Sequence, residues 1–197
     1  MSVFNRHEEI WRQLAGELQG QFVAGGFWKE DKVEARWEGW TITLDKYVDH
    51  GGKSHRAYTR LRAPYVNPDG FRFRIYRKSI FTGIGKALGL VQDIEIGDEQ
   101  FDRDFVIQGN SEEKVRAMLR RPQLRALIEA QPDICFEVKD DEGWFGASFP
   151  EGVDELYFLA SGVIKDLEQL RGLYKLFTEV LDYLHSVGSA GGGAAIR

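Results

Sequence analysis

Basic residues gather in one stretch of an otherwise acidic sequence. The 197-residue chain has 26 Lys and Arg against 31 Asp and Glu, a net charge of −5. The stretch from Lys53 to Lys78 nevertheless holds eight Lys or Arg and the single acid Asp69, a local net charge of +7. Because a guanidinium presents a planar fork of N–H donors, such a stretch is typical of phosphate or carboxylate recognition.

Four of these residues alternate with apolar ones along two strand-like runs: Arg60, Arg62, Arg72 and Arg74. Because successive side chains of a strand point to opposite faces, we expect all four guanidinium groups on one side of a hairpin. Two interpretations stay open. The face binds an anionic small molecule or an acidic protein surface, or it pairs with acids of the same chain such as Asp45.

A glycine-lysine motif from Gly83 to Lys86 has some features of a phosphate-binding loop, in which backbone N–H groups approach the phosphate. Its spacing does not fit. A Walker loop requires glycine and Ser or Thr where Ile80 and Ala87 stand, and the dinucleotide fingerprint requires glycine where Leu88 stands. The motif therefore predicts no nucleotide site, and we expect no cofactor.

The candidate nucleophiles also depart from their motifs. Proline occupies the last position of Gly146–Pro150, where the nucleophile elbow G-x-S-x-G requires glycine, so Ser148 is predicted to lie in a strand. Cys135, the only cysteine, alternates with apolar neighbours, which predicts a buried and inert thiol. A single cysteine excludes an intramolecular disulfide and favours a reducing compartment.

Histidines and acids form no recognisable metal motif. His7, His50, His55 and His185 lack the helical spacing that aims two imidazoles at one metal ion. Six acids lie within residues 93–104, but their order departs from an EF-hand loop, so we interpret them as caps and solvent-facing charges. No catalytic or metal-binding residue is therefore assigned. An enzyme would need groups that meet only in the fold, such as Asp49, His50, His55 and the acids near Asp98.

Hydrophobic periodicity predicts an α+β fold. Apolar residues at helical spacing predict helices at 5–19 and 165–187, with two shorter helices on either side of Pro122, the first capped at Asn110. Alternation predicts strands at 33–37, 41–47, 54–63, 71–77, 105–107, 134–138, 144–149 and 156–160. We expect a curved antiparallel sheet of about seven or eight strands, with the long C-terminal helix packed on it and shorter helices at the edges.

The connections predict how the first strands are arranged. Asn67-Pro68-Asp69-Gly70 is a strong turn sequence, because proline presets one dihedral angle and glycine accepts a positive one. The four strands between residues 22 and 78 would then form an antiparallel meander. The stretch 79–98 is predicted to be a weak helix or an ordered loop.

The chain is predicted to be a single domain over residues 1–187, followed by a disordered Gly- and Ala-rich tail at 188–197. Glu8 and Glu9 precede any apolar run, unlike in a signal peptide, and no window approaches the ~20 apolar residues of a membrane span. We therefore expect a soluble cytoplasmic protein. An apolar stripe from Ile80 to Val91 beside basic residues favours core packing, with attachment to an anionic membrane surface as the alternative.

One segment carries a resemblance. Residues 97–110 read GDEQFDRDFVIQGN and resemble a segment, GD-x-x-FD-x-x-F-x-[IV]-x-G-[ND], found before a helix in a family of uncharacterised bacterial proteins. The segments 25–28, 40–45 and 141–146 resemble other parts of such proteins, so the likeness spans most of the chain and implies a bacterial protein without an assigned activity. In this segment we expect Asp98 to turn the chain, Phe101 and Phe105 to point inward and Asn110 to cap the next helix.

These observations favour a non-enzymatic binding or scaffold module, because no catalytic motif has its required spacing. The predicted ligand or partner is anionic, and its candidate site is the set Arg60, Arg62, Arg72 and Arg74. The overall acidity argues against a nucleic-acid coat protein. Two alternatives remain: an enzyme assembled only in the fold, and a protein of the membrane surface.

Overall fold

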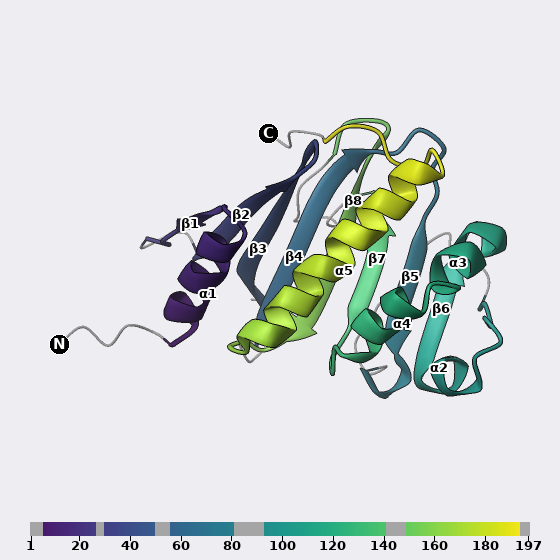
Figure 1. Ribbon diagram of the computed structural model, residues 1–197, viewed down its shortest axis with the longest axis horizontal. Helices are drawn as coiled ribbons and strands as arrows, with labels where there is room; N and C mark the ends of the chain where they lie inside the picture. Colours follow the sequence, from purple (N-terminus) through teal and green to yellow (C-terminus); the bar gives the residue numbers. More distant parts are fainter. Residues whose placement is uncertain (1–5, 27–29, 50–55, 81–92, 141–148, 194–197) are drawn as a thin grey trace.

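Alternating apolar and polar residues build one antiparallel sheet. The computed structural model describes residues 6–26, 30–49, 56–80, 93–140 and 149–193. Within these residues eight strands lie in the order β1-β2-β3-β4-β8-β7-β5-β6, and every neighbouring pair is antiparallel (Figure 1). The strands are β1 (Gln21–Val23), β2 (Lys32–Trp37), β3 (Trp40–Asp49), β4 (Arg56–Val66), β5 (Phe73–Arg77), β6 (Phe105–Gly109), β7 (Cys135–Lys139) and β8 (Val153–Ser161).

The helices cover the sheet as predicted for a curved α+β fold. Figure 1 shows α5 crossing the middle of the sheet, and α5 contacts both α1 and α4. The α+β prediction, with a long C-terminal helix and shorter helices, is confirmed. The helices are α1 (Arg6–Glu17), α2 (Glu99–Asp104), α3 (Glu112–Leu119), α4 (Pro122–Glu129) and α5 (Leu167–Ser186), with the 3-10 turn η1 (Lys78–Ile80).

The long helix α5 supplies the largest apolar stripe of the core. It begins at the N-cap Asp166, whose side chain accepts a hydrogen bond from the N–H of Gln169 at 2.7 Å. Its buried residues follow helical spacing and include Leu170, Phe177 and Leu181. The ring of Phe177 lies 5.5 Å from the ring of Phe136 on β7. This packing of helix on sheet buries most of the apolar side chains that the sequence pattern had indicated.

Strands β1 to β4 follow one another as a meander, but β5 does not continue it. On its far side β4 pairs with β8 over nine residues, from Tyr58 opposite Ser161 to Val66 opposite Val153. Strand β5 lies instead between β7 and β6. The predicted hairpin of the strands at 54–63 and 71–77 is therefore wrong, because β8 occupies the edge of β4 that β5 was expected to take.

The turn after β4 forms as predicted, although it joins strands that are not neighbours. Gly70 has a φ of 65°, and Asp69 Oδ1 accepts a hydrogen bond from the N–H of Phe71 at 3.0 Å. The side chain of Asn110 braces the same turn, donating to Gly70 O at 2.7 Å and accepting from the N–H of Arg72 at 2.9 Å. The turn is thus held by a residue 40 positions away.

The segment before α3 confirms some of the sequence predictions and corrects one. Asp98 is the N-cap of α2, a six-residue helix too short for periodicity to reveal. Phe101 and Phe105 are buried and stack with ring centroids 4.4 Å apart, as expected. The predicted cap of α3 is wrong: Ser111, not Asn110, is its N-cap. The strand predicted at 144–149, apart from Phe149, and most of the stretch 79–98 lie outside the described residues.

The described part of the C-terminal tail is packed against the sheet. Ser189 and Ala190 are buried, the N–H of Gly191 donates to Val66 O at 2.7 Å, and Gly193 bridges to Tyr65. The Nε1 of Trp40 also donates to Gly191 O at 2.9 Å. The prediction of disorder therefore does not hold for residues 188–193. The extent of the predicted single domain stays a prediction.

Truncating the centre of α5 should destabilise the whole sheet. Phe177 has 0% exposure, so Phe177→Ala leaves a cavity, and we expect the free energy of unfolding to fall by about 3–5 kcal/mol. The exposed neighbour Lys175 provides the control, because Lys175→Ala should change it by less than about 0.5 kcal/mol. Urea unfolding followed by circular dichroism measures both, and equal effects would contradict the central position of Phe177.

Candidate functional site

Arg60 and Arg62 lie on β4 and share one carboxylate from β3. The Nε and Nη2 of Arg60 donate to Oδ1 and Oδ2 of Asp45 at 2.8 and 2.9 Å. The Nη2 of Arg62 donates to Asp45 Oδ2 at 2.8 Å. The register places Arg60 directly opposite Asp45, which accounts for the two-pronged contact. The guanidinium of Arg60 also lies 5.0 Å from the ring centroid of Tyr47.

Arg72 precedes β5 and binds two carboxylates at one end of the sheet. Its Nε and Nη2 donate to Asp154 at 2.9 and 3.0 Å, and its Nη1 donates to Asp140 Oδ2 at 2.7 Å. The hydrogen bonds to Asp154 raise the pKa of Arg72 above its ordinary value, outweighing the opposing effect of partial burial. Asp154, with a side chain 4% exposed, also accepts from Asn67 Nδ2 at 2.6 Å.

Arg74 lies on β5 opposite Glu137 of β7. Its Nε is 3.3 Å from Glu137 Oε2, and its Nη2 is 3.9 Å from the sulfur of Cys135. The guanidinium also stands 5.7 Å from the ring centroid of Tyr76 on the same strand. Each of the four predicted arginines is therefore paired with at least one carboxylate of the same chain.

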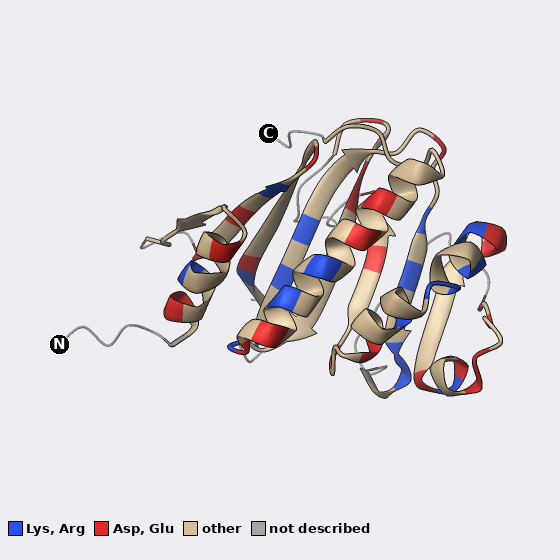
Figure 2. Cartoon of the chain, viewed as in Figure 1, with Lys and Arg blue, Asp and Glu red and all other residues tan. Residues whose placement is uncertain are grey.

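The structure does not bring these four arginines into one cluster. Two strands, β8 and β7, lie between β4 and β5, so Arg60 and Arg74 are about 14 Å apart across the sheet at the usual strand spacing. Figure 2 shows the two basic strands separated in this way. The binding role of Arg60, Arg62, Arg72 and Arg74 stays a prediction, but a single ligand would have to span two groups.

The described histidines and the cysteine make structural contacts. His7 Nε2 is 3.0 Å from Asp31 Oδ2, and His185 Nδ1 is 3.0 Å from Ala190 O. Burial, reinforced by the charge of Glu137, raises the pKa of Cys135 to about 11, so its thiol is protonated at neutral pH. His50 and His55, and the side chain of Asp49, lie outside the described residues.

The acids at 93–104 act mainly as caps and turn braces. Asp98 accepts from the N–H of Phe101 at 3.2 Å, and Asp102 accepts from the N–H groups of Ile96 and Gly97, both at 2.9 Å. These contacts agree with the interpretation of the acidic stretch as capping groups. Among the residues that the structure describes, no three His, Cys, Asp or Glu side chains gather into a metal site.

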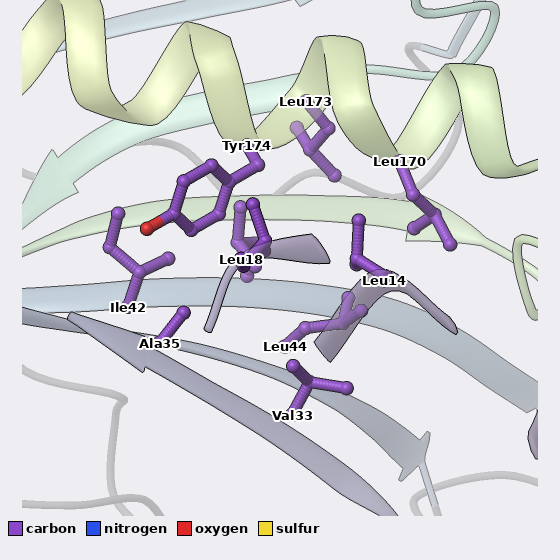
Figure 3. A pocket seen from close by; sticks show the side chains of 10 residues that line it. Leu14, Leu18, Val33, Ala35, Ile42, Leu44, Leu170, Leu173 and Tyr174 are labelled. Carbon is purple, nitrogen blue, oxygen red and sulfur yellow. The ribbon is translucent and has the colours of Figure 1, made fainter. Parts of the chain in front are cut away.

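An apolar seam runs between α1, α5 and strands β2 to β4. Figure 3 shows its side chains converging from both layers, with the Tyr174 hydroxyl at one end. Its open volume is about 10 Å³, at most the space of one water molecule. The seam is therefore a packed part of the hydrophobic core, without a ligand-sized cavity. Its lining residues are Leu14, Leu18, Val33, Ala35, Ile42, Leu44, Leu61, Leu170, Leu173 and Tyr174.

A larger and more polar recess lies where the segment before α2 meets α3 and α4. Its volume is about 380 Å³, within the range of small-molecule sites. Three guanidinium groups and one carboxylate give its wall a positive balance. Its lining residues are Ile96, Gly97, Asp98, Arg116, Leu119, Arg120 and Arg125.

Sequence reasoning missed this recess. Arg116 and Arg120 are four residues apart on one helix, which places them on the same face and was the one available signal. Arg125 follows Pro122 on a separate helix, and its approach depends on how α3 and α4 pack. The basic stretch that stands out in the sequence, residues 53–78, lies in a different part of the chain.

The chain is thus an α+β protein in which a long C-terminal helix covers an antiparallel sheet. A basic recess lies beside β6, the strand at one edge of that sheet. No family model and no curated protein matches the chain. Among solved structures, it is similar to the mycobacterial trehalose monomycolate transport factor A, TtfA, with a TM-score of 0.57 and 8% identity over 98% of this chain and 100% of that chain. At this identity the likeness shows the fold alone. None of the helices in the described residues is long and apolar enough to cross a membrane.

Acid should weaken the contact between the β4–β5 turn and the C-terminal segment. Partial burial raises the pKa of Asp69, but hydrogen bonds from Lys114, the Phe71 N–H and Ser189 together hold it below its ordinary value. The ionised carboxylate therefore stabilises the fold fully above the unfolded-state pKa of about 3.9, and this contribution is lost as pH falls through the lower folded-state pKa.

The variant Asp69→Asn isolates this contribution. Between about pH 6 and pH 3 its free energy of unfolding should fall less steeply than that of the unchanged protein, because it has no carboxylate to protonate there. The exposed Asp133 serves as the control, and Asp133→Asn should leave the slope unchanged. Parallel pH curves for all three proteins, measured by urea unfolding, would contradict the role of Asp69.

The thiol of Cys135 should be unreactive in the folded protein. With a pKa of about 11 and 8% exposure, the thiol stays protonated at pH 8 and is shielded from solvent. We expect reaction with Ellman's reagent to be slow in the native protein and rapid in denaturant. Equal rates in the two conditions would show that the thiol is accessible and would refute its buried role.

Proposed function

We propose that this chain is a non-enzymatic binding or scaffold module that recognises an anionic ligand or partner. The observation that carries the proposal is the role of the described histidines, Asp98 and Cys135; the other candidates for catalysis, His50, His55 and the side chain of Asp49, lie outside the described residues. His7, His185 and Asp98 make hydrogen bonds that hold the fold, and the Cys135 thiol is buried and protonated. One ring nitrogen of each histidine and both oxygens of Asp98 are engaged within the chain, and a buried, protonated thiol is a poor nucleophile.

The recess beside α3 supports the choice of an anion. It offers three guanidinium groups around one hollow, and charge-assisted hydrogen bonds to several arginines add geometric specificity as well as energy. By contrast, an anion at Arg60 or Arg72 would have to displace the carboxylate of Asp45 or Asp154 that already binds two nitrogens. The recess is therefore the stronger candidate for ligand binding.

The structural likeness agrees with a role outside catalysis. TtfA is described as a transport factor, and its whole resolved chain aligns with nearly all of this one. A shared fold does not carry a shared ligand, because ligands are chosen by side chains and 8% identity leaves those unrelated. The likeness thus supports the non-enzymatic class and leaves the ligand to the site itself.

A ligand screen tests the proposed function. Thermal unfolding is measured with inorganic phosphate, citrate and glycerol 3-phosphate, using NaCl at matched ionic strength and glycerol as controls. A ligand at about 100 times its Kd should raise Tm by about 5–10 °C, because it binds only the folded state. The shift should shrink as NaCl is added, since salt screens the attraction.

The same incubations separate binding from catalysis. Recovery of each compound unchanged by NMR supports a binding module. Conversion of a probe would instead favour the enzyme alternative, and a panel in which no anion exceeds the NaCl control would refute the proposed anion recognition.

A further inference from the structure

The three arginines of the recess come from two helices that meet at Pro122. Arg116 and Arg120 lie on the last turn and at the C-cap of α3, and Arg125 lies on α4. The apolar side of the recess is Leu119, which is 1% exposed, together with the half-buried Ile96. The guanidinium groups thus stand around a small partly apolar hollow.

Two of these arginines are fixed in place by contacts that leave other N–H donors available. Arg116 uses its Nε to bind Glu112 Oε1 at 2.7 Å. Arg125 donates from Nη1 to Leu119 O at 2.5 Å, and its Nε lies 3.3 Å from Asp98 Oδ2. The described contacts leave both Nη groups of Arg116 and the Nη2 of Arg125 for a ligand. Such a pre-ordered fork loses little conformational entropy on binding.

The third arginine has no partner in the described part of the chain. The side chain of Arg120 is exposed and makes neither a hydrogen bond nor an ion pair there. It stands one helical turn from Arg116, so the two like charges repel each other. The negative end of the α3 dipole offsets part of this repulsion, but it does not account for the third guanidinium contributed by α4.

Two carboxylates oppose the three guanidinium groups: Asp98 in the recess lining, and Glu112 on α3, which pairs with Arg116 outside the lining. Asp98 lines the recess, caps α2 and pairs with Arg125. An anion entering the recess would meet its repulsion as well as the attraction of the arginines. Three guanidinium groups against the carboxylates of Asp98 and Glu112 leave one positive charge, that of Arg120, so the balance still favours an anion.

We infer that this recess, formed by Arg116, Arg120 and Arg125, binds a phosphate monoester group. The inference rests on the proposed anion-binding function and gives it a place and a ligand class. A dianionic phosphate offers three oxygens to three guanidinium groups, and Arg is suited to such multidentate contacts. A volume of about 380 Å³ has room for the phosphate and a small organic body, with the half-buried Ile96 as the apolar contact for that body.

The test measures phosphate affinity by ³¹P and ¹⁵N NMR titration. The probes are inorganic phosphate and glycerol 3-phosphate, with sedimentation on phosphatidylcholine vesicles containing phosphatidic acid as a further arm. Binding of the soluble probes identifies a small molecule as the ligand, and binding to the vesicles identifies a lipid headgroup. Either source supports the inference when the amides of Gly97 and Arg120 shift on titration.

Two variants are expected to change the phosphate affinity in opposite directions, which makes the test specific to this recess. Arg120→Gln removes an exposed charge that holds no other group, and should weaken phosphate binding about tenfold or more. Asp98→Asn removes the opposing charge while keeping a good N-cap residue, and should tighten binding about fivefold. The control Arg103→Gln neutralises an arginine on α2 that is 71% exposed and lies outside the recess lining, and should leave affinity unchanged.

Two results would overturn the inference without touching the proposed function. The first is phosphate binding that is equal in Arg120→Gln, Asp98→Asn and the unchanged protein, which would place the anion site elsewhere. The second is binding of citrate with no binding of either phosphate probe or of the vesicles. If no anion of the panel binds, the proposed function fails as well. Unchanged circular dichroism and Tm without ligand show that each variant is folded.

Discussion

The pairing of β4 with β8 determines most of the remaining architecture. It joins a strand from the first third of the chain to one near its end over nine residue pairs. Because β7 pairs on the other side of β8, and β5 on the other side of β7, strands from both parts of the sequence form one continuous sheet. That sheet gives α5 a single apolar face to cover, and it separates the two basic strands.

The arginines differ in role because they differ in burial. A guanidinium removed from water needs a carboxylate partner, since an unpaired buried charge would cost several kcal/mol. Arg60 and Arg74, with side chains 13% and 10% exposed, therefore pair with Asp45 and Glu137 across the strands. Arg120 is exposed on a helix and can remain unpaired, because water solvates its charge. Among the recess arginines only Arg120 is unpaired in the described part of the chain, whereas Arg116 and Arg125 pair through Nε and keep Nη donors for a ligand.

The β4–β5 turn and helix α5 are held to the sheet by different kinds of contact. Beside the β4–β5 turn, Asp154 accepts from Arg72 and Asn67, while Asp69 accepts from Lys114 and Ser189. The hydrogen bond from Ser189 to Asp69 anchors the segment after α5 to this turn. Helix α5 is held mainly by apolar packing, as the Phe136–Phe177 contact shows, with polar contacts such as Trp37 Nε1 to Asp182 on its exposed side. The recess lies outside both regions, where the segment before α2 meets α3 and α4.

Elements with local signals could be predicted from the sequence. Apolar periodicity located α5 and most strands, the Asn67–Gly70 turn followed from its dihedral requirements, and the alternation around Cys135 indicated a buried thiol. The sequence could not determine which strands are neighbours, because pairing depends on chain segments about 90 residues apart competing for one edge. Position in the sheet then decided which arginines meet carboxylates, and the packing of α3 on α4 decided that Arg116, Arg120 and Arg125 share a recess. Both outcomes are set by long-range contacts, whereas helix and strand patterns are set by residues close in sequence.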